Sequence, residues 1–168
     1  MPPGGGLTTA PSFVGAVGGT SARCPGGRPG PSVTRMEIPE QYKYAVIPHI
    51  MVDRADEAIS FYAAAFGASE NFRLDGDDGG IVHAEISIQG SVLMLGDAHA
   101  PFSSPGAAGG VSVVLHVYVP DVDALTAQAV AAGAELLSPP TDMPYGARQS
   151  MLRDPFGHVW IFLTPIAA

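Results

Sequence analysis

Two stretches of this chain repeat one another at an offset of 67 positions, and that repeat restricts the possible folds more than any other feature. His49 falls on His116, and Asp56 falls on Asp123. In each stretch a strand-like run precedes apolar residues at helical spacing, a glycine and further short strands. Two copies of one βαβββ order predict an α+β domain of two similar modules, in which each helix covers one face of its sheet.

The modules have clear expected limits. We predict the first over 44–97 and the second over 111–164, and Asp53 and Asp121 are expected to cap their helices. A segment rich in proline, glycine and alanine, 98–110, is interpreted as a linker or lid. A segment of about 130 residues buries roughly two thirds of its unfolded surface, so a single folded domain over 40–168 is expected.

The N-terminal 1–39 differs in composition from the rest of the chain. Its first 35 residues contain nine glycines and six prolines, which predicts a disordered tail because little apolar surface can be buried. A flexible tail, a targeting peptide and a start site placed upstream of the true one are three interpretations. The tail lacks the hydrophobic segment of a secretory signal. We favour the third interpretation, with Met36 as the start.

The charge of the chain excludes some partners. All 16 acidic residues lie beyond position 36, where only Lys43 and four arginines oppose them. Such an acidic domain is not expected to bind nucleic acid, which requires clustered basic residues. No apolar stretch is long enough to span a membrane. Cys24 is the single cysteine, so no intrachain disulfide is possible, and we expect a cytoplasmic protein.

Side-chain alternation along the predicted strands sorts several polar residues onto one face of each sheet. That face points away from the helix, so its side chains would border a cavity. Imidazole and carboxylate groups there can bind a ligand, hold a metal or move a proton. The residues expected on these faces are His49, His83, Glu85, His116 and Tyr118, and we expect Arg148 and Ser150 to join them.

Several short motifs resemble a known superfamily. They include Phe66-Gly67-Ala68, His83-Ala84-Glu85 and the run from Asp154 to Trp160, Asp-Pro-Phe-Gly-His-Val-Trp. In this order they are similar to the vicinal oxygen chelate superfamily of glyoxalase I, bleomycin-resistance proteins and extradiol dioxygenases, and most of all to its PhnB-like branch. The resemblance covers nearly all of 44–164. It implies two βαβββ modules whose curved mixed sheets enclose a cavity, often in a homodimer.

The resemblance also implies where a metal would bind. In the superfamily's metalloenzymes the ligands come from the first and last strands of each module. The corresponding positions here are Ile47, Met94, Val114 and Ile161, all of which are apolar. A displaced site made by His49, Glu85 and His116 stays open as an alternative, because these residues share the expected face. It would suit Zn, Ni, Mn or Fe.

Three functions are therefore open. The one that we favour is binding of a small molecule in the cavity between the modules, without the standard metal site. The expected ligand contacts are His49, His83, His116, Arg148 and Ser150. The alternative is a metal-dependent lyase, isomerase or dioxygenase in which Glu85 or Tyr118 moves a proton. The third is a structural or regulatory domain that acts through its dimer surface.

Overall fold

The structure, a computed structural model, describes residues 39–43 and 45–166. The predictions of a disordered tail and of a start at Met36 therefore lie outside the described residues, as does Cys24. Within the described part, no helix is both long enough and apolar enough to cross a membrane.

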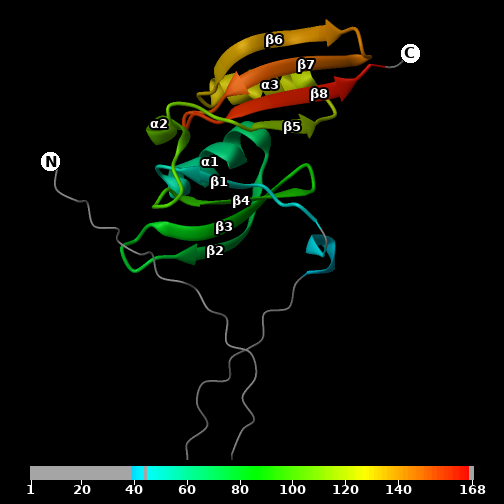
Figure 1. The fold of residues 1–168 in the computed structure, drawn as a ribbon. Helices are drawn as coiled ribbons and strands as arrows, with labels where there is room; N and C mark the ends of the chain where they lie inside the picture. Colours follow the sequence, from blue (N-terminus) through cyan, green and yellow to red (C-terminus); the bar gives the residue numbers. More distant parts are fainter. Residues whose placement is uncertain (1–38, 44, 167–168) are drawn as a thin grey trace, which may run out of the picture. The chain divides into compact units, whose positions relative to one another are not determined.

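The first module forms a four-stranded mixed sheet, sheet A, with one long helix (Figure 1). Its strand order is β1-β4-β3-β2, in which β1 pairs with β4 in parallel and the other neighbours are antiparallel. The elements are η1 (Glu40–Tyr42), β1 (His49–Val52), α1 (Ala55–Phe66), β2 (Ser69–Asp75), β3 (Ile81–Ile88) and β4 (Ser91–Asp97).

The second module repeats this arrangement in sheet B, with the strand order β5-β8-β7-β6. Its elements are β5 (Val114–Tyr118), α3 (Val122–Ala131), β6 (Glu135–Met143), β7 (Ala147–Arg153) and β8 (Val159–Pro165), and the short helix α2 (Pro105–Ala108) lies in the linker. Two modules with the same connectivity confirm the predicted α+β fold of paired βαβββ units.

The two long helices begin in different ways. The Asp121 carboxylate accepts a hydrogen bond of 2.9 Å from the Ala124 amide and caps α3, as predicted. Asp53 does not cap α1. Its place is taken by Asp97, at the end of β4, which accepts a bond of 2.9 Å from the Ala55 amide. The helix ends at Gly67, whose φ of 66° is the left-handed conformation that glycine adopts without a steric penalty.

A buried carboxylate joins the two modules. Asp154, in the turn before β8, accepts hydrogen bonds of 2.7 Å from the Tyr62 hydroxyl of α1 and 2.9 Å from the Trp160 indole. The amides of Phe156 and His158 donate to its other oxygen. Burial, followed by the negative charge of Asp154, raises the pKa of Tyr62 well above its ordinary value. The phenol thus stays protonated and fixes one module on the other.

Candidate functional site

A polar cluster lies on the face of sheet A that points away from α1, which we call the open face of sheet A. His49 on β1 stands opposite Met94 on β4, and Met94 stands opposite Glu85 on β3. Residues opposite one another in a sheet share a face. His49 and Glu85 are therefore on the same face, with His83 two residues before Glu85 on the same strand.

Direct contacts connect the members of this cluster. The Tyr42 hydroxyl donates a hydrogen bond of 2.8 Å to Glu85 Oε2. His83 Nε2 is 3.5 Å from Glu85 Oε1, and the rings of His49 and His83 meet edge to face with centroids 5.3 Å apart. Sequence reasoning missed Tyr42, because it precedes the first module and no alternation pattern includes it.

Two pKa shifts describe the protonation of this cluster. The hydrogen bond to Glu85 raises the pKa of Tyr42, so the phenol remains a donor at neutral pH. Partial burial lowers the pKa of His49, and the nearby His83 and His99 lower it further. At neutral pH the His49 imidazole is therefore uncharged and can both donate and accept a hydrogen bond.

Two more of the predicted polar residues lie on the open face of sheet B, which points away from α3. His116 and Tyr118 occupy the open face of β5, and His116 stands opposite Ile161 on β8 just as His49 stands opposite Met94. Both residues line a pocket of about 260 Å³, whose other wall includes the turn between β3 and β4. The open faces of the two sheets thus carry histidines at equivalent positions of the repeat.

These positions bear on the metal that the resemblance implies. His49 and Glu85 lie on sheet A, whereas His116 lies on sheet B and lines the pocket of about 260 Å³. Among the residues that the structure describes, no three His, Cys, Asp or Glu side chains come together as a metal site. The four positions that correspond to the superfamily's ligands are aliphatic or thioether side chains, which do not hold a hard or borderline divalent ion. The residues present therefore do not fit the standard metal.

Two predicted ligand contacts, Ser150 and Arg148, lie on the side of β7 that faces α3 and not on the open face of sheet B. Ser150 is buried and stands opposite Phe162, which is part of the core. Its hydroxyl accepts a 2.7 Å hydrogen bond from Thr126 of α3. Arg148 shares this side of β7 and binds the carboxylates of Asp123 and Asp142, each with a shortest distance of 2.7 Å. Neither residue lines a described pocket. The expectation that they border the cavity was wrong in its choice of face.

The residues beside Arg148 and Ser150 occupy the open face of sheet B instead. Gln149 stands opposite Leu163, and Met151 stands opposite Ile161, on the side of β7 that α3 does not cover. The sequence of β7 alone does not show which alternate residues of this strand face α3 and which face away from it. The signal was present in α3, where Asp123 and Thr126 supply polar partners at helical spacing.

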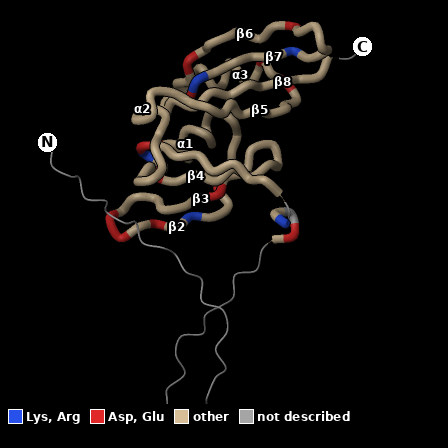
Figure 2. Tube along the Cα trace, in the orientation of Figure 1, with Lys and Arg blue, Asp and Glu red and all other residues tan. Residues whose placement is uncertain are grey.

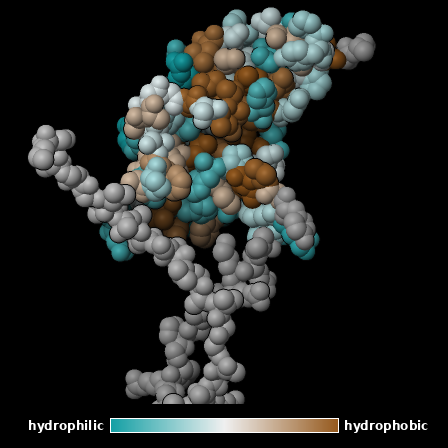
Figure 3. Space-filling view, in the orientation of Figure 1, coloured by the Kyte–Doolittle hydropathy of each residue, from teal (hydrophilic) through white to brown (hydrophobic). Residues whose placement is uncertain are grey.

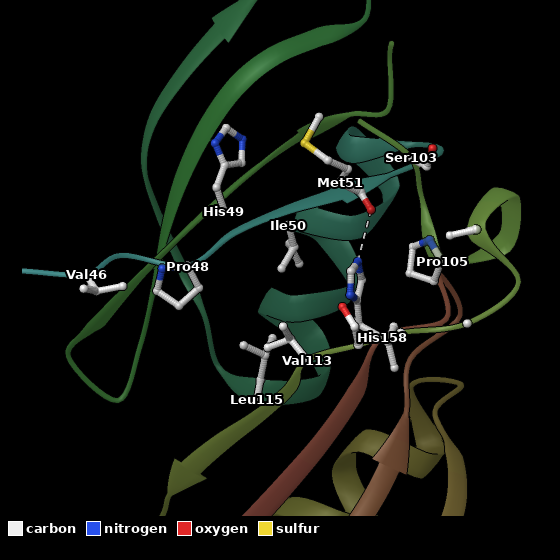
Figure 4. Close-up of a pocket in the computed structure, with 14 residues that line it drawn as sticks. Val46, Pro48, His49, Ile50, Met51, Ser103, Pro105, Val113, Leu115 and His158 are labelled. Carbon is white, nitrogen blue, oxygen red and sulfur yellow. Dashed lines mark hydrogen bonds between the residues drawn. The ribbon is translucent and has the colours of Figure 1, made fainter. Parts of the chain in front are cut away.

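A larger pocket of about 500 Å³ lies where the modules meet (Figure 4). We call it the inter-module pocket. The imidazole of His158, from the turn before β8, reaches across to the Met51 carbonyl of β1 at 3.1 Å. The lining residues come from β1 and the segment before it, the linker, the segment that leads into β5, β5 itself and the turn before β8. They are Val46, Pro48, His49, Ile50, Met51, Ser103, Pro105, Ala108, Gly110, Val111, Ser112, Val113, Leu115 and His158.

The lining of this pocket is largely apolar. Among the described residues that line it, none is Lys, Arg, Asp or Glu, and the charged residues of the domain lie elsewhere (Figure 2). Hydrophobic residues gather over β5 and β8 on the face drawn in Figure 3. The polar side chains of the wall are the imidazoles of His49 and His158 and the hydroxyls of Ser103 and Ser112, and the other lining residues are apolar.

Comparison with known proteins agrees with this architecture. The family model of the Glyoxalase/Bleomycin resistance protein/Dioxygenase superfamily matches residues 44–162. An uncharacterised protein of Mycobacterium bovis, Mb0911c, is 39% identical over 127 residues, which are 73% of this chain and 84% of that protein.

Solved structures show the same fold. TioX from Micromonospora sp. ML1 superimposes with a TM-score of 0.59 at 29% identity, over 74% of this chain and 98% of TioX. The PhnB protein from Bacillus cereus superimposes with a TM-score of 0.55 at 20% identity, over 71% of this chain and 98% of that chain. With its two βαβββ modules and a family match across both of them, the chain belongs to the glyoxalase/bleomycin resistance/dioxygenase superfamily.

Proposed function

We propose that this chain is a small-molecule-binding member of its superfamily, which holds its ligand in the inter-module pocket without the standard metal. The observation that carries the proposal is the pocket itself, with about 500 Å³ of space between β1 and β5. Pockets of this size and largely apolar lining are typical of sites that bury a small organic ligand.

The lining indicates what part of a ligand would enter. Burying a charge without a counter-ion is costly, and the described lining offers no Lys, Arg, Asp or Glu. The portion of the ligand inside the pocket should therefore be uncharged and mainly apolar. His49, whose lowered pKa keeps it neutral, and His158 can each make one directional hydrogen bond.

A second copy of the chain is the partner that we propose. The open faces of both sheets expose apolar and aromatic side chains, including Phe72 at 50% and Leu74 at 51% on sheet A and Tyr118 at 67% on sheet B. Exposed patches of this kind mark interaction surfaces. A homodimer in which these faces meet would bury them, and the cytoplasm is the compartment that we expect for it.

The dimer can be tested independently of ligand binding. Tyr118→Glu adds a charge to the open face of sheet B, while Val130→Glu adds the same charge to an exposed position of α3. Light scattering should give a dimer for the parent and for Val130→Glu, and a monomer for Tyr118→Glu. A monomeric parent protein would exclude the homodimer.

Ligand binding is tested with N-phenyl-1-naphthylamine, an uncharged probe that fluoresces in apolar surroundings. Val113→Arg places a cation at the edge of the pocket, and Val130→Arg is the matched control outside it. The parent and Val130→Arg should bind the probe, and Val113→Arg should bind it at least roughly tenfold more weakly. Equal binding by all three proteins would contradict the proposed pocket.

A further inference from the structure

Ring-bearing side chains gather beside the Glu85 carboxylate on the open face of sheet A. Phe72 on β2 stands directly opposite Glu85, so the two side chains share this face. The Phe72 and His83 rings have centroids 6.0 Å apart, and the Tyr42 hydroxyl is bound to Glu85. His49, which also lines the inter-module pocket, meets His83 on the other side.

The Glu85 carboxylate is held in place but keeps capacity for another partner. Its Oε2 accepts the bond from Tyr42, whereas Oε1 is 3.5 Å from His83 Nε2, which is too far for a strong hydrogen bond. The Glu85 side chain is 15% exposed, so it is shielded from water yet reachable. A carboxylate in such surroundings attracts a cation more strongly than one in open water.

Phe72 is unusual for its position. It lies on β2, which is at the edge of sheet A, and its side chain is 50% exposed. Edge strands are usually protected by charged residues or proline, because an exposed hydrophobic edge favours aggregation. An aromatic ring held beside a carboxylate has a chemical use, since its face attracts cations.

We propose that Tyr42, Phe72, His83 and Glu85, which we call the amine site, bind a ligand that carries a protonated or quaternary amine. Glu85 supplies the negative charge, and the face of the Phe72 ring attracts the cation. The His83 ring, whose centroid is 6.0 Å from that of Phe72, borders the site. The Tyr42 hydrogen bond fixes the orientation of the carboxylate. The amine site does not depend on the inter-module pocket, although His49 touches both and one ligand could occupy both. In the proposed homodimer the second copy would lie over the open face of sheet A and so cover this site.

The test uses choline and its uncharged isostere 3,3-dimethylbutan-1-ol, titrated into the full chain by calorimetry and followed by NMR. Glu85→Gln removes the charge but retains an oxygen that accepts from Tyr42. Glu57→Gln is the matched control, because it removes one negative charge from an exposed position of α1. Phe72→Leu removes the ring from an exposed position and leaves an apolar side chain.

Choline should bind the parent and Glu57→Gln with equal affinity, and bind Glu85→Gln and Phe72→Leu each roughly tenfold more weakly. The uncharged isostere should bind the parent at least roughly tenfold more weakly than choline. Absence of choline binding to the parent at millimolar concentration, or equal binding by parent and Glu85→Gln, would overturn the proposal. Val113→Arg separates the two proposals, since it should weaken binding of N-phenyl-1-naphthylamine at least roughly tenfold and leave that of choline unchanged.

Discussion

Tyr42 donates a hydrogen bond of 2.8 Å to Glu85, a residue 43 positions further along the chain. The bond attaches the short helix η1, which precedes the first module, to β3 in the middle of sheet A. A segment outside the repeat thus contributes to the polar face that the repeat creates.

Tyr42→Phe should release η1 from sheet A while leaving the rest of the domain folded. The Glu85 hydrogen bond raises the pKa of Tyr42, so the bond stabilises the fold below pH about 10 and is lost as pH rises through the folded pKa. Hydrogen exchange at 40–43 should become faster in Tyr42→Phe at neutral pH. Unchanged exchange there would mean that the hydroxyl does not hold η1.

His49 should titrate below its ordinary pKa of 6.5, chiefly because it is partly buried. A histidine with a lowered folded pKa binds its proton more readily when unfolded. Its contribution therefore makes the protein less stable as pH falls below about 6.5 and vanishes above that pH. NMR titration of the imidazole protons gives the pKa directly, and His49→Asn should flatten this part of the stability profile. A pKa at or above 6.5 would contradict the described environment.

Asp154→Ala should cost at least about 3 kcal/mol of unfolding free energy, because it leaves buried donors without an acceptor. The donors are the Tyr62 hydroxyl, the Trp160 indole and two amides. Asp142→Ala is the control, since it removes an exposed carboxylate that pairs with Arg148 and should cost much less. Urea unfolding of both variants measures the difference. Similar losses would show that Asp154 does not join the modules.

Ser150→Ala should lower the unfolding free energy by about 1 kcal/mol, because the buried hydrogen bond between the Thr126 and Ser150 hydroxyls is lost, while Thr126 keeps the Val122 carbonyl as an acceptor. It should not change the binding of N-phenyl-1-naphthylamine, because the side chain faces α3 and not the pocket. Chemical unfolding and probe titration on the same sample separate these effects. A loss of probe binding without a loss of stability would restore Ser150 as a ligand contact.

The fold could be predicted from the sequence because each helix and strand has its own periodic pattern of apolar residues, and the order of these elements occurs twice. Asp121 is predictable as a helix cap because it precedes α3 directly, whereas the cap of α1 comes from Asp97, 42 residues beyond Ala55. Strand parity placed His49, His83 and Glu85 on one face without any knowledge of distances.

The remainder of the site depends on contacts that the sequence does not encode locally. Tyr42 reaches Glu85 from outside the repeat, and Arg148 turns toward Asp123 because α3 lies over that side of β7. The inter-module pocket depends on how β1, the linker and β5 pack, which no single strand pattern specifies.

An NMR titration tests whether the chain binds a small molecule between its modules without a metal. N-phenyl-1-naphthylamine is titrated into methyl-labelled protein before and after treatment with a strong chelator. We expect shifts at Val113 and Leu115, which line the pocket, and the same affinity in both samples. Shifts only at methyl groups remote from the pocket, or binding that disappears after chelation, would show that the inter-module pocket is not a metal-independent ligand site.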